Sequence, residues 1–284
     1  MRNRKITGSN PVRPIKRVKI QQGGNLMDKF VIAQMLKKSE PVKKVGFIEE
    51  LCRNKDVLDL GCIRHSAEVA LSDPNWLHQK IKTVAKTVVG IDYLQNEIVK
   101  MNAVGYTIKF ADVTKPFFIG EQFDVIVIGA LIEHLSNIDA LFDNCKKHLN
   151  PNGKIIISTA NPFYADEFLY ISWKRNYLMN PEHTCWIDPY AMAQLIERQG
   201  FEISEMHFIK DSWSLPNIIT ESEQHQMDIM NNQWTGETKY QEIYRHIIGK
   251  LFWGFYLGFK VMFSFNTKLV KHSDYLIVIK QNRE

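Results

Sequence analysis

The chain has 284 residues, 45% of them hydrophobic and 24% charged, a composition typical of globular proteins and not of disordered ones. Its net charge of +5 comes from residues 1–26, which hold seven basic residues and no acidic one and leave 29 basic against 31 acidic residues in the remainder. The body therefore lacks the basic surface of a nucleic-acid-binding protein, and we expect no nucleic-acid partner.

The first 26 residues form a segment of a different kind. They show neither helical nor strand periodicity, and several glycines and prolines interrupt them, which predicts a disordered basic arm. The stretch Gly8-Ser9-Asn10-Pro11 can be encoded by DNA that resembles the T-arm of a transfer-RNA gene. Our hypothesis is that translation starts at Met27 and that residues 1–26 are not native.

The four cysteines are scattered along the chain, with no C-x-x-C pair. This spacing argues against a zinc site or a disulfide framework and is consistent with a reducing, cytoplasmic location. The N-terminus also lacks the apolar segment of a secretory signal.

The stretch from Lys55 to Glu68 organises the rest of the chain. Residues 57–60 form a short apolar run that predicts a strand, Gly61 follows as a turn, and a helical pattern begins near Ser66. A strand, a glycine turn and a helix open a nucleotide-binding α/β unit, in which backbone N–H groups face the ligand. Asp59 lies two residues before Gly61, and no G-x-G-x-x-G dinucleotide fingerprint follows.

Further strands are predicted at 87–92, 106–110, 123–130 and 154–159, with a turn at 150–153, and helices at 76–86, 94–103 and 137–149 alternate with them. In nucleotide-binding units an acid at the end of the second strand lies about 20 residues past the glycines. Asp92 lies 31 residues past Gly61, so residues 73–86 are predicted to be an insertion. The run at 123–130 is almost wholly apolar, as expected of a strand that is buried on both faces. Alternating strands and helices predict a doubly wound α/β fold, with the ligand over the carboxyl ends of parallel strands. Residues 27–210 are the predicted core.

Two more strands, at 201–210 and 273–280, are predicted to form an antiparallel pair at one sheet edge, giving a Rossmann-like sheet of seven strands. Residues 211–272, which separate them, are predicted to be an inserted lid and helical cover, and residues 273–284 to complete the core. The run 247–265 is very apolar but contains Lys250 and Lys260, which argues against a membrane span. It leaves three alternatives: a buried helix, a dimer face, or an interfacial helix in peripheral contact with a membrane.

Three blocks of sequence resemble the class I S-adenosylmethionine-dependent methyltransferases. The first resembles D-x-G-x-G-x-G, although Ile63 and His65 stand in place of its second and third glycines. The others are the F-D-V-I and I-E-H-L block at 123–135 and L-x-P-x-G-K-I-I-I-S-T at 149–159. They are similar to the group that includes the ubiquinone-pathway O-methyltransferases, and the resemblance covers residues 57–209 and the final strand.

The resemblance implies S-adenosyl-L-methionine as cofactor and assigns residues to it. It implies that an acid after the second strand accepts hydrogen bonds from the ribose hydroxyls, and that an acid after the third accepts from the adenine amine. Bulky residues in the first loop also predict that the backbone there adopts positive φ only at a cost. The cofactor-binding residues implied are Asp59 and Gly61, with Arg64 or His65, for the amino-acid end, Asp92 for the ribose, Tyr93, Asp112 and Val113 for the adenine, and Gly129 and Glu133 at the fourth strand.

Methyl transfer to a hydroxyl benefits from a base that works near neutral pH, which histidine supplies most easily. His183 is the preferred catalytic candidate and His134 the second, although either can be a structural histidine. Glu133 and His134 suit a divalent metal, but the sequence offers no evident third ligand, so no metal site is expected. The predicted reaction is methyl transfer to a small-molecule or glycan acceptor, including a lipid-linked one, at a hydroxyl oxygen. The alternatives are a cofactor-binding protein without turnover and an NAD-dependent oxidoreductase.

Overall fold

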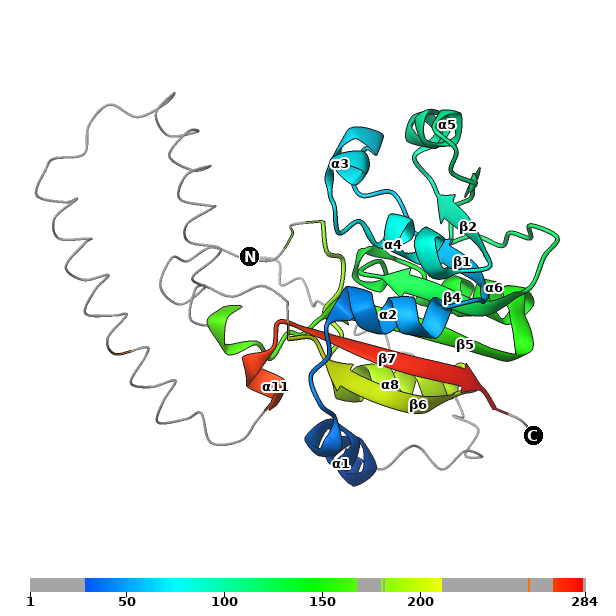
Figure 1. Ribbon diagram of the computed structural model, residues 1–284. Coiled ribbons are helices and arrows are strands. Elements are labelled where there is room, and N and C mark those ends of the chain that lie inside the picture. The colour runs from blue at the N-terminus through cyan, green and yellow to red at the C-terminus, as the bar shows by residue number, and fades with distance from the viewer. Residues whose placement is uncertain (1–28, 168–179, 181, 211–254, 256–267, 283–284) are drawn as a thin grey trace, which may run out of the picture.

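A seven-stranded sheet forms the centre of the computed structural model, which describes residues 29–167, 180, 182–210, 255 and 268–282 (Figure 1). The strand order is β3-β2-β1-β4-β5-β7-β6, and β7 runs antiparallel to its neighbours β5 and β6. The other paired strands are parallel. The strands are β1 Asp56–Leu60, β2 Thr87–Asp92, β3 Ile108–Phe110, β4 Phe123–Gly129, β5 Leu149–Ala160, β6 Phe201–Phe208 and β7 Asp274–Gln281.

This topology confirms the predicted fold class, including the edge pair formed by β6 and β7. The order of strands reverses between β1 and β4. From β1, the sheet extends on one side through β2 and β3, and on the other side through β4 and β5. In open α/β sheets such a reversal opens a crevice at the carboxyl ends of the strands, where ligands bind.

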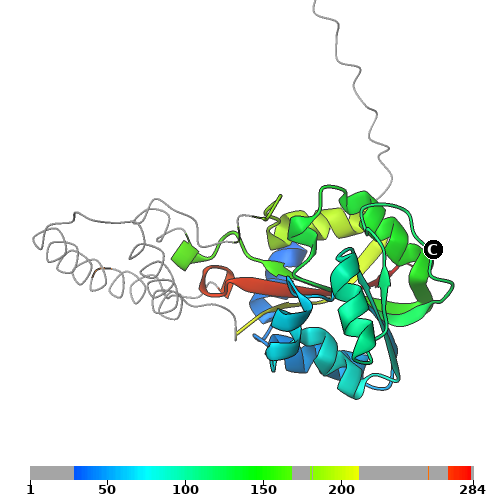
Figure 2. The same ribbon diagram turned by 90° about the horizontal axis from the view of Figure 1, so that it is seen from above.

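Helices cover both faces of the sheet, as the two views show (Figures 1 and 2). Helices α2 and α4 share one apolar cluster with the sheet, and α1, α6 and α8 share another. Helices α3 and α5 contribute to a third cluster, which includes β3. The helices are α1 Lys29–Lys38, α2 Lys44–Cys52, α3 Ala67–Ser72, α4 Leu77–Val84, α5 Gln95–Ala103, the 3₁₀ turn η1 Ile132–His134, α6 Ile138–His148, α8 Pro189–Arg198 and α11 Lys268–Lys271.

The packing of strand β4 shows why residues 125–128 are all apolar. Val125 and Val127 pack into the cluster of α2 and α4, whereas Ile126 and Ile128 pack into the cluster on the opposite face. All four are almost fully buried. Alternate residues of a strand point to opposite faces, so a strand covered on both sides needs apolar residues at every position.

Polar residues cap the N-termini of two helices. The Ser66 hydroxyl accepts the Val69 N–H at the start of α3, and the Asp188 carboxylate accepts two N–H groups at the start of α8, where Pro189 is the first helical residue. The turn predicted at 150–153 takes another form: it is an irregularity within β5, where the ladder with β4 shifts register.

The predicted arm 1–26 and the apolar run 247–265, apart from residue 255, lie outside the described residues, as does most of the insertion 211–272. Within the described part of the chain, no helix is long and apolar enough to cross a membrane.

Candidate functional site

The carboxyl ends of β1, β2, β3 and β4 bring most of the predicted cofactor residues to one edge of the sheet. Gly61 directly follows β1, Asp92 ends β2 and Gly129 ends β4. Asp92 pairs with Phe110, the last residue of β3, so Asp112 follows close to the same level. The sheet register therefore gathers these positions at the carboxyl-terminal edge, where ligands bind in sheets of this topology.

Gly61 occupies a position that only glycine fits easily. Its φ is +68°, and a Cβ atom there would lie 2.8 Å from Cδ1 of Leu131, on the loop after β4. Its N–H donates to the Ile91 carbonyl at 2.8 Å, which ties the loop to β2. The absence of a side chain lets the loops after β1 and β4 approach each other closely.

His65 replaces a glycine of the resembling motif and still adopts the left-handed conformation, with φ of +58°. This is the backbone path that bulky residues were expected to make costly. Histidine is among the non-glycine residues that enter this region more often, but its Cβ atom still raises the energy there. The loop therefore holds a strained residue at this position.

Replacing His65 with glycine should stabilise the fold. Relief of the left-handed strain exceeds the extra entropy of glycine in the unfolded chain, so we expect about 0.5–1 kcal/mol more unfolding free energy. Urea denaturation measures this change, with His65→Ala as the matched control because alanine keeps the Cβ atom. Equal stability of the glycine and alanine variants would show that His65 carries no strain.

Asp59 lies beneath the loop and not at its surface. Its carboxylate is 3% exposed, and Oδ2 lies 2.9 Å from Nδ1 of His78, a buried histidine on α4. Its contact is therefore with the protein itself. The expectation that Asp59 touches the amino-acid end of the cofactor stays a prediction.

Asp92 also makes structural contacts. Its carboxylate accepts the backbone N–H groups of Ile63 at 2.8 Å, Tyr93 at 2.8 Å and Leu94 at 3.1 Å. Burial raises the pKa of this carboxyl group, while the three N–H groups act in the opposite direction. A carboxylate has about four acceptor positions, so about one is left for a ribose hydroxyl.

Asp112 is more accessible, with 36% of its side chain exposed. Hydrogen bonds from the Thr114 hydroxyl and from Lys115 lower its pKa to about 2, so it is ionised and can accept from an exocyclic amine. Tyr93 is 67% exposed, so its ring face is available for stacking, whereas Val113 is buried beside Asp112.

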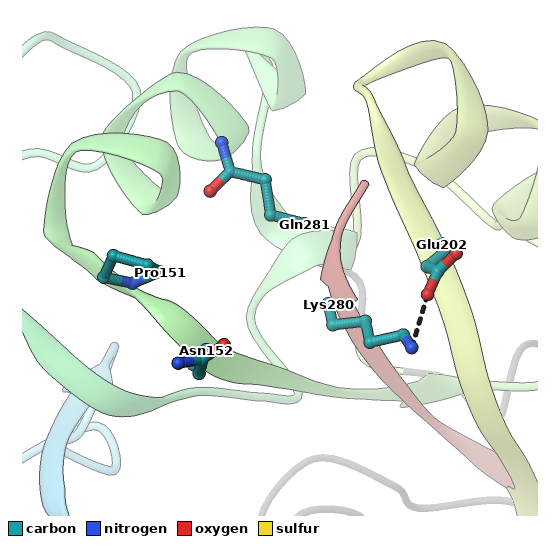
Figure 3. Close-up of a pocket in the computed structure, with 6 residues that line it drawn as sticks. Pro151, Asn152, Glu202, Lys280 and Gln281 are labelled. Carbon is teal, nitrogen blue, oxygen red and sulfur yellow. Dashed lines mark ion pairs between the residues drawn. The ribbon is translucent and has the colours of Figure 1, made fainter. Parts of the chain in front are cut away.

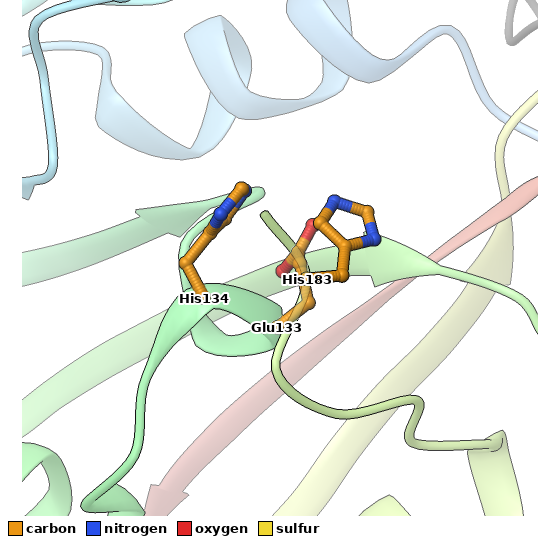
Figure 4. A group of neighbouring side chains, drawn as sticks. All are labelled: Glu133, His134 and His183. Atoms are coloured by element: carbon orange, nitrogen blue, oxygen red, sulfur yellow. The ribbon is translucent and has the colours of Figure 1, made fainter. Parts of the chain in front are cut away.

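The two catalytic candidates meet at the other side of the crevice, together with Glu133 (Figure 4). The rings of His134 and His183 are 4.7 Å apart and nearly perpendicular. Glu133 and His134 belong to η1, directly after β4, whereas His183 comes from the loop before α8. The fold therefore brings distant segments of the chain to one point.

Glu133 is fixed from both sides. Its Oε2 accepts the Thr159 hydroxyl of β5 at 2.9 Å, and its backbone carbonyl accepts the Thr184 N–H at 2.8 Å. It is 3% exposed, and burial raises the pKa of its carboxyl group. Thr184, bound to Glu133, holds the neighbouring His183 beside η1.

The environment of His183 favours a neutral imidazole. Burial and, secondarily, the nearby His134 lower its pKa. Its Nδ1 atom is buried and has no hydrogen-bond partner among the described residues. A neutral imidazole at neutral pH can accept a proton or ligate a metal ion.

The same three residues have the geometry of a cation site. One ligand atom from each of Glu133, His134 and His183 lies within 4.8 Å of the others. His183 is therefore a candidate for the third ligand, which the sequence did not reveal. Two imidazoles and one carboxylate suit zinc or another first-row divalent ion.

A separate hollow lies at the opposite edge of the sheet and offers no such chemistry (Figure 3). It is formed around the start of β5 and the end of β7, where Lys280 pairs with Glu202 at 2.5 Å. In a sheet of this kind the ligand crevice is at the carboxyl ends of the parallel strands, so we do not assign a site here.

Three residues that contact the predicted site were not found from the sequence: His78, Thr159 and Thr184. Each acts through another residue, since His78 binds Asp59 and the two threonines bind Glu133. The segment 73–86 was recognised as an insertion, but nothing in its sequence marks His78 as a partner of Asp59.

Comparison with curated proteins finds similarity to methyltransferases. The chain is 26% identical over 156 residues to a probable S-adenosylmethionine-dependent methyltransferase of Mycolicibacterium smegmatis, covering 54% of each protein. It is 30% identical over 175 residues to a ubiquinone biosynthesis O-methyltransferase of Agrobacterium fabrum, covering 56% of this chain and 66% of that protein. The chain thus spans 54% of the length of the first of these relatives.

Solved structures of similar fold include a SAM-dependent methyltransferase from Archaeoglobus fulgidus. The TM-score is 0.49 at 16% identity, over 89% of this chain and 93% of that one. The family description "Methyltransferase domain" matches residues 32–205, which is more than half of the chain. The chain therefore belongs to the methyltransferase domain family, within the class I S-adenosylmethionine-dependent methyltransferases.

Proposed function

We propose that this protein transfers a methyl group from S-adenosylmethionine to a hydroxyl oxygen of a small-molecule acceptor. The observation that carries the proposal is the position of His183, an imidazole with lowered pKa beside Glu133 and His134 at the carboxyl end of β4. Such a group is suited to remove a proton from a hydroxyl during methyl transfer.

We expect the loops at the carboxyl ends of β1 to β4 to hold the adenosyl cofactor of the family. At Gly61 the loop after β1 approaches Leu131 so closely that a side chain on residue 61 would clash with it. Asp112 provides an accessible, ionised hydrogen-bond acceptor after β3. Asp92 and Tyr93 would hold the ribose and the adenine, and the loop around Gly61 the amino-acid end. When bound, the cofactor supplies a methyl group activated by a sulfonium.

The protein's contribution is alignment and proton removal. Methyl transfer is an in-line displacement, so placing the acceptor oxygen correctly supplies much of the acceleration. With the cofactor bound, the acceptor oxygen would bond to the methyl carbon as the methyl–sulfur bond breaks, leaving S-adenosylhomocysteine, and the hydroxyl proton would pass to Nε2 of His183. Glu133, held by Thr159, would then stabilise the imidazolium by its negative charge.

The acceptor class rests on weaker support. The Agrobacterium fabrum relative is an O-methyltransferase by name, which favours a hydroxyl over an amine. The sequence runs at 181–186 and 188–201 resemble methyltransferases found with surface-polysaccharide enzymes, and on that resemblance we add glycan hydroxyls, lipid-linked ones included, to the candidates.

A panel assay tests the proposal. Purified protein is incubated with S-adenosylmethionine labelled in its methyl group and with phenols, sugar alcohols, amines and thiols of similar size. We expect label in the hydroxyl compounds; transfer to the amines or thiols alone would contradict the proposal. Calorimetry with S-adenosylmethionine and NAD separates the rivals, since a non-catalytic protein would bind the former without transfer and an oxidoreductase would bind NAD.

The cluster offers a second way to activate the same hydroxyl. A divalent ion held by Glu133, His134 and His183 would polarise the acceptor oxygen directly. Dialysis against a chelator distinguishes the two, because loss of activity that Zn²⁺ or Mg²⁺ restores requires an ion. Activity that is unchanged after the chelator, with no metal detected by elemental analysis, favours the base.

The pH profile should have its acid limb below pH 6.5. The lowered pKa of His183 keeps the imidazole neutral at pH 7, so the base is available there and is lost as pH falls through that pKa. In His134→Gln the charge that helps to lower the pKa is removed, and we expect the limb to move upward. An acid limb above pH 7 in the native protein would contradict this assignment.

A further inference from the structure

The insertion 73–86 contacts the loop after β1, residues 61–66, at several points. We call this loop the cofactor loop. Trp76 Nε1 donates to the Cys62 carbonyl at 2.7 Å, and Arg64 pairs with Asp73. Beneath the loop, His78 Nδ1 lies 2.9 Å from Asp59 Oδ2. We call these three contacts the loop brace.

The loop brace is mostly buried. Trp76 is 4% exposed and His78 is 1% exposed, and their rings lie 5.3 Å apart. The ring of Tyr106, next to β3, packs against Trp76 at 4.9 Å, edge to face. A Cβ atom on Gly90 of β2 would lie 3.1 Å from His78 Cε1, so the ring fills the space beside that strand. The insertion is therefore packed between the sheet and the loop.

The loop has a physical need for such support. His65 holds the left-handed conformation without being glycine, and such conformations persist only where the surroundings determine them. His78 and Trp76 provide contacts of this kind on both sides of the loop backbone. His78 binds Asp59 near the end of β1, and Trp76 binds the Cys62 carbonyl in the loop.

We propose that His78 is a positioning residue, which holds Asp59 and with it the loop 61–66 in the conformation that binds the cofactor. On this assignment Asp59 serves the loop and does not contact the ligand directly. The insertion thereby provides the order that glycines and a tight turn provide where the motif is regular.

The expected effect follows from the population of loop conformations. If only part of the protein holds the binding conformation, the apparent dissociation constant rises by the inverse of that fraction. Loss of the His78 contact should therefore weaken cofactor binding about tenfold if about one tenth of the molecules stay competent. The turnover rate at saturating cofactor should be unchanged, since binding selects the same state.

His78→Asn and His78→Gln form a matched pair. The amide nitrogen of asparagine can take the place of Nδ1 and keep the bond to Asp59, whereas that of glutamine takes the place of Nε2. Glutamine fills the volume better, so a packing role would make it the milder change. A positioning role makes asparagine the milder one.

Two measurements are made on each variant. Calorimetry with S-adenosylhomocysteine gives the dissociation constant without any acceptor, so failure of the proposed O-methylation does not affect it. Hydrogen exchange of the cofactor-free protein reports opening of residues 61–66. We expect glutamine to raise the dissociation constant about tenfold and the loop exchange by at least as much, and asparagine to keep the dissociation constant within about threefold of the native value.

Glutamine that binds as tightly as asparagine, or exchange that rises throughout the sheet and not in the loop, would overturn the proposal. Trp76→Phe keeps an aromatic ring at the position and removes the N–H that binds Cys62, so the loop should again exchange faster. Unchanged exchange there would also count against the proposal. Tyr106→Phe is the control, because it removes a hydrogen bond to Gln79 of the insertion and no contact of the loop.

Discussion

Replacing His183 with alanine should lower kcat by about 10²–10⁴-fold, the usual contribution of a positioned acid or base. The change removes the proton acceptor but no group that is assigned to the cofactor. The dissociation constant of S-adenosylmethionine should therefore stay within about threefold of the native value, because no cofactor contact is removed. Steady-state kinetics and calorimetry on the same preparation measure the two effects.

Imidazole in solution provides the control for this variant. A base that is missing from the site can be replaced by a small base that diffuses into the cavity, so added imidazole should restore part of the rate of His183→Ala. Thr184→Val tests whether Thr184 holds the loop that carries His183. Valine keeps the size of threonine but loses the hydroxyl bonds to the carbonyls of Glu133 and Leu135. A loss of less than about tenfold for His183→Ala would assign the histidine to packing.

Replacing Asp92 with alanine should weaken S-adenosylmethionine binding by about 10–100-fold, since a charge-assisted hydrogen bond contributes about 1.5–3 kcal/mol. The same change leaves the N–H groups of Ile63, Tyr93 and Leu94 without their acceptor. A buried donor left unpaired costs about 1–3 kcal/mol, so the unfolding free energy should also fall.

Asp92→Asn separates the two effects. Its oxygen can still accept the N–H groups of Tyr93 and Leu94, but its amide cannot accept from Ile63. We expect a smaller loss of stability than in Asp92→Ala, with cofactor binding still weakened. Calorimetry and urea denaturation measure both quantities. Unchanged cofactor affinity in a folded Asp92→Ala protein would show that Asp92 serves the loop alone.

The strands could be predicted from the sequence because each is a local pattern. Strand β4 is almost wholly apolar since both of its faces are covered, and α3 and α8 begin after Ser66 and Asp188, which cap them by accepting neighbouring N–H groups. The turn at 150–153 was less predictable, since its place inside the ladder depends on the register between β4 and β5.

The site was predictable only in part. The acids after β2 and β3 could be located because the ends of parallel strands share an edge, which requires no knowledge of side-chain direction. That Asp59 binds His78, and that three N–H groups occupy Asp92, depends on which way each side chain turns in the packed structure.

The sequence by itself determined the doubly wound sheet, the family resemblance and the edge at which a cofactor would bind, because periodicity and short motifs are properties of neighbouring residues. Only the tertiary structure placed His183 beside Glu133 and His134 and set the insertion against the cofactor loop. These contacts join segments that lie far apart along the chain. Their geometry is decided by the packing of helices and loops on the sheet, which no local pattern records.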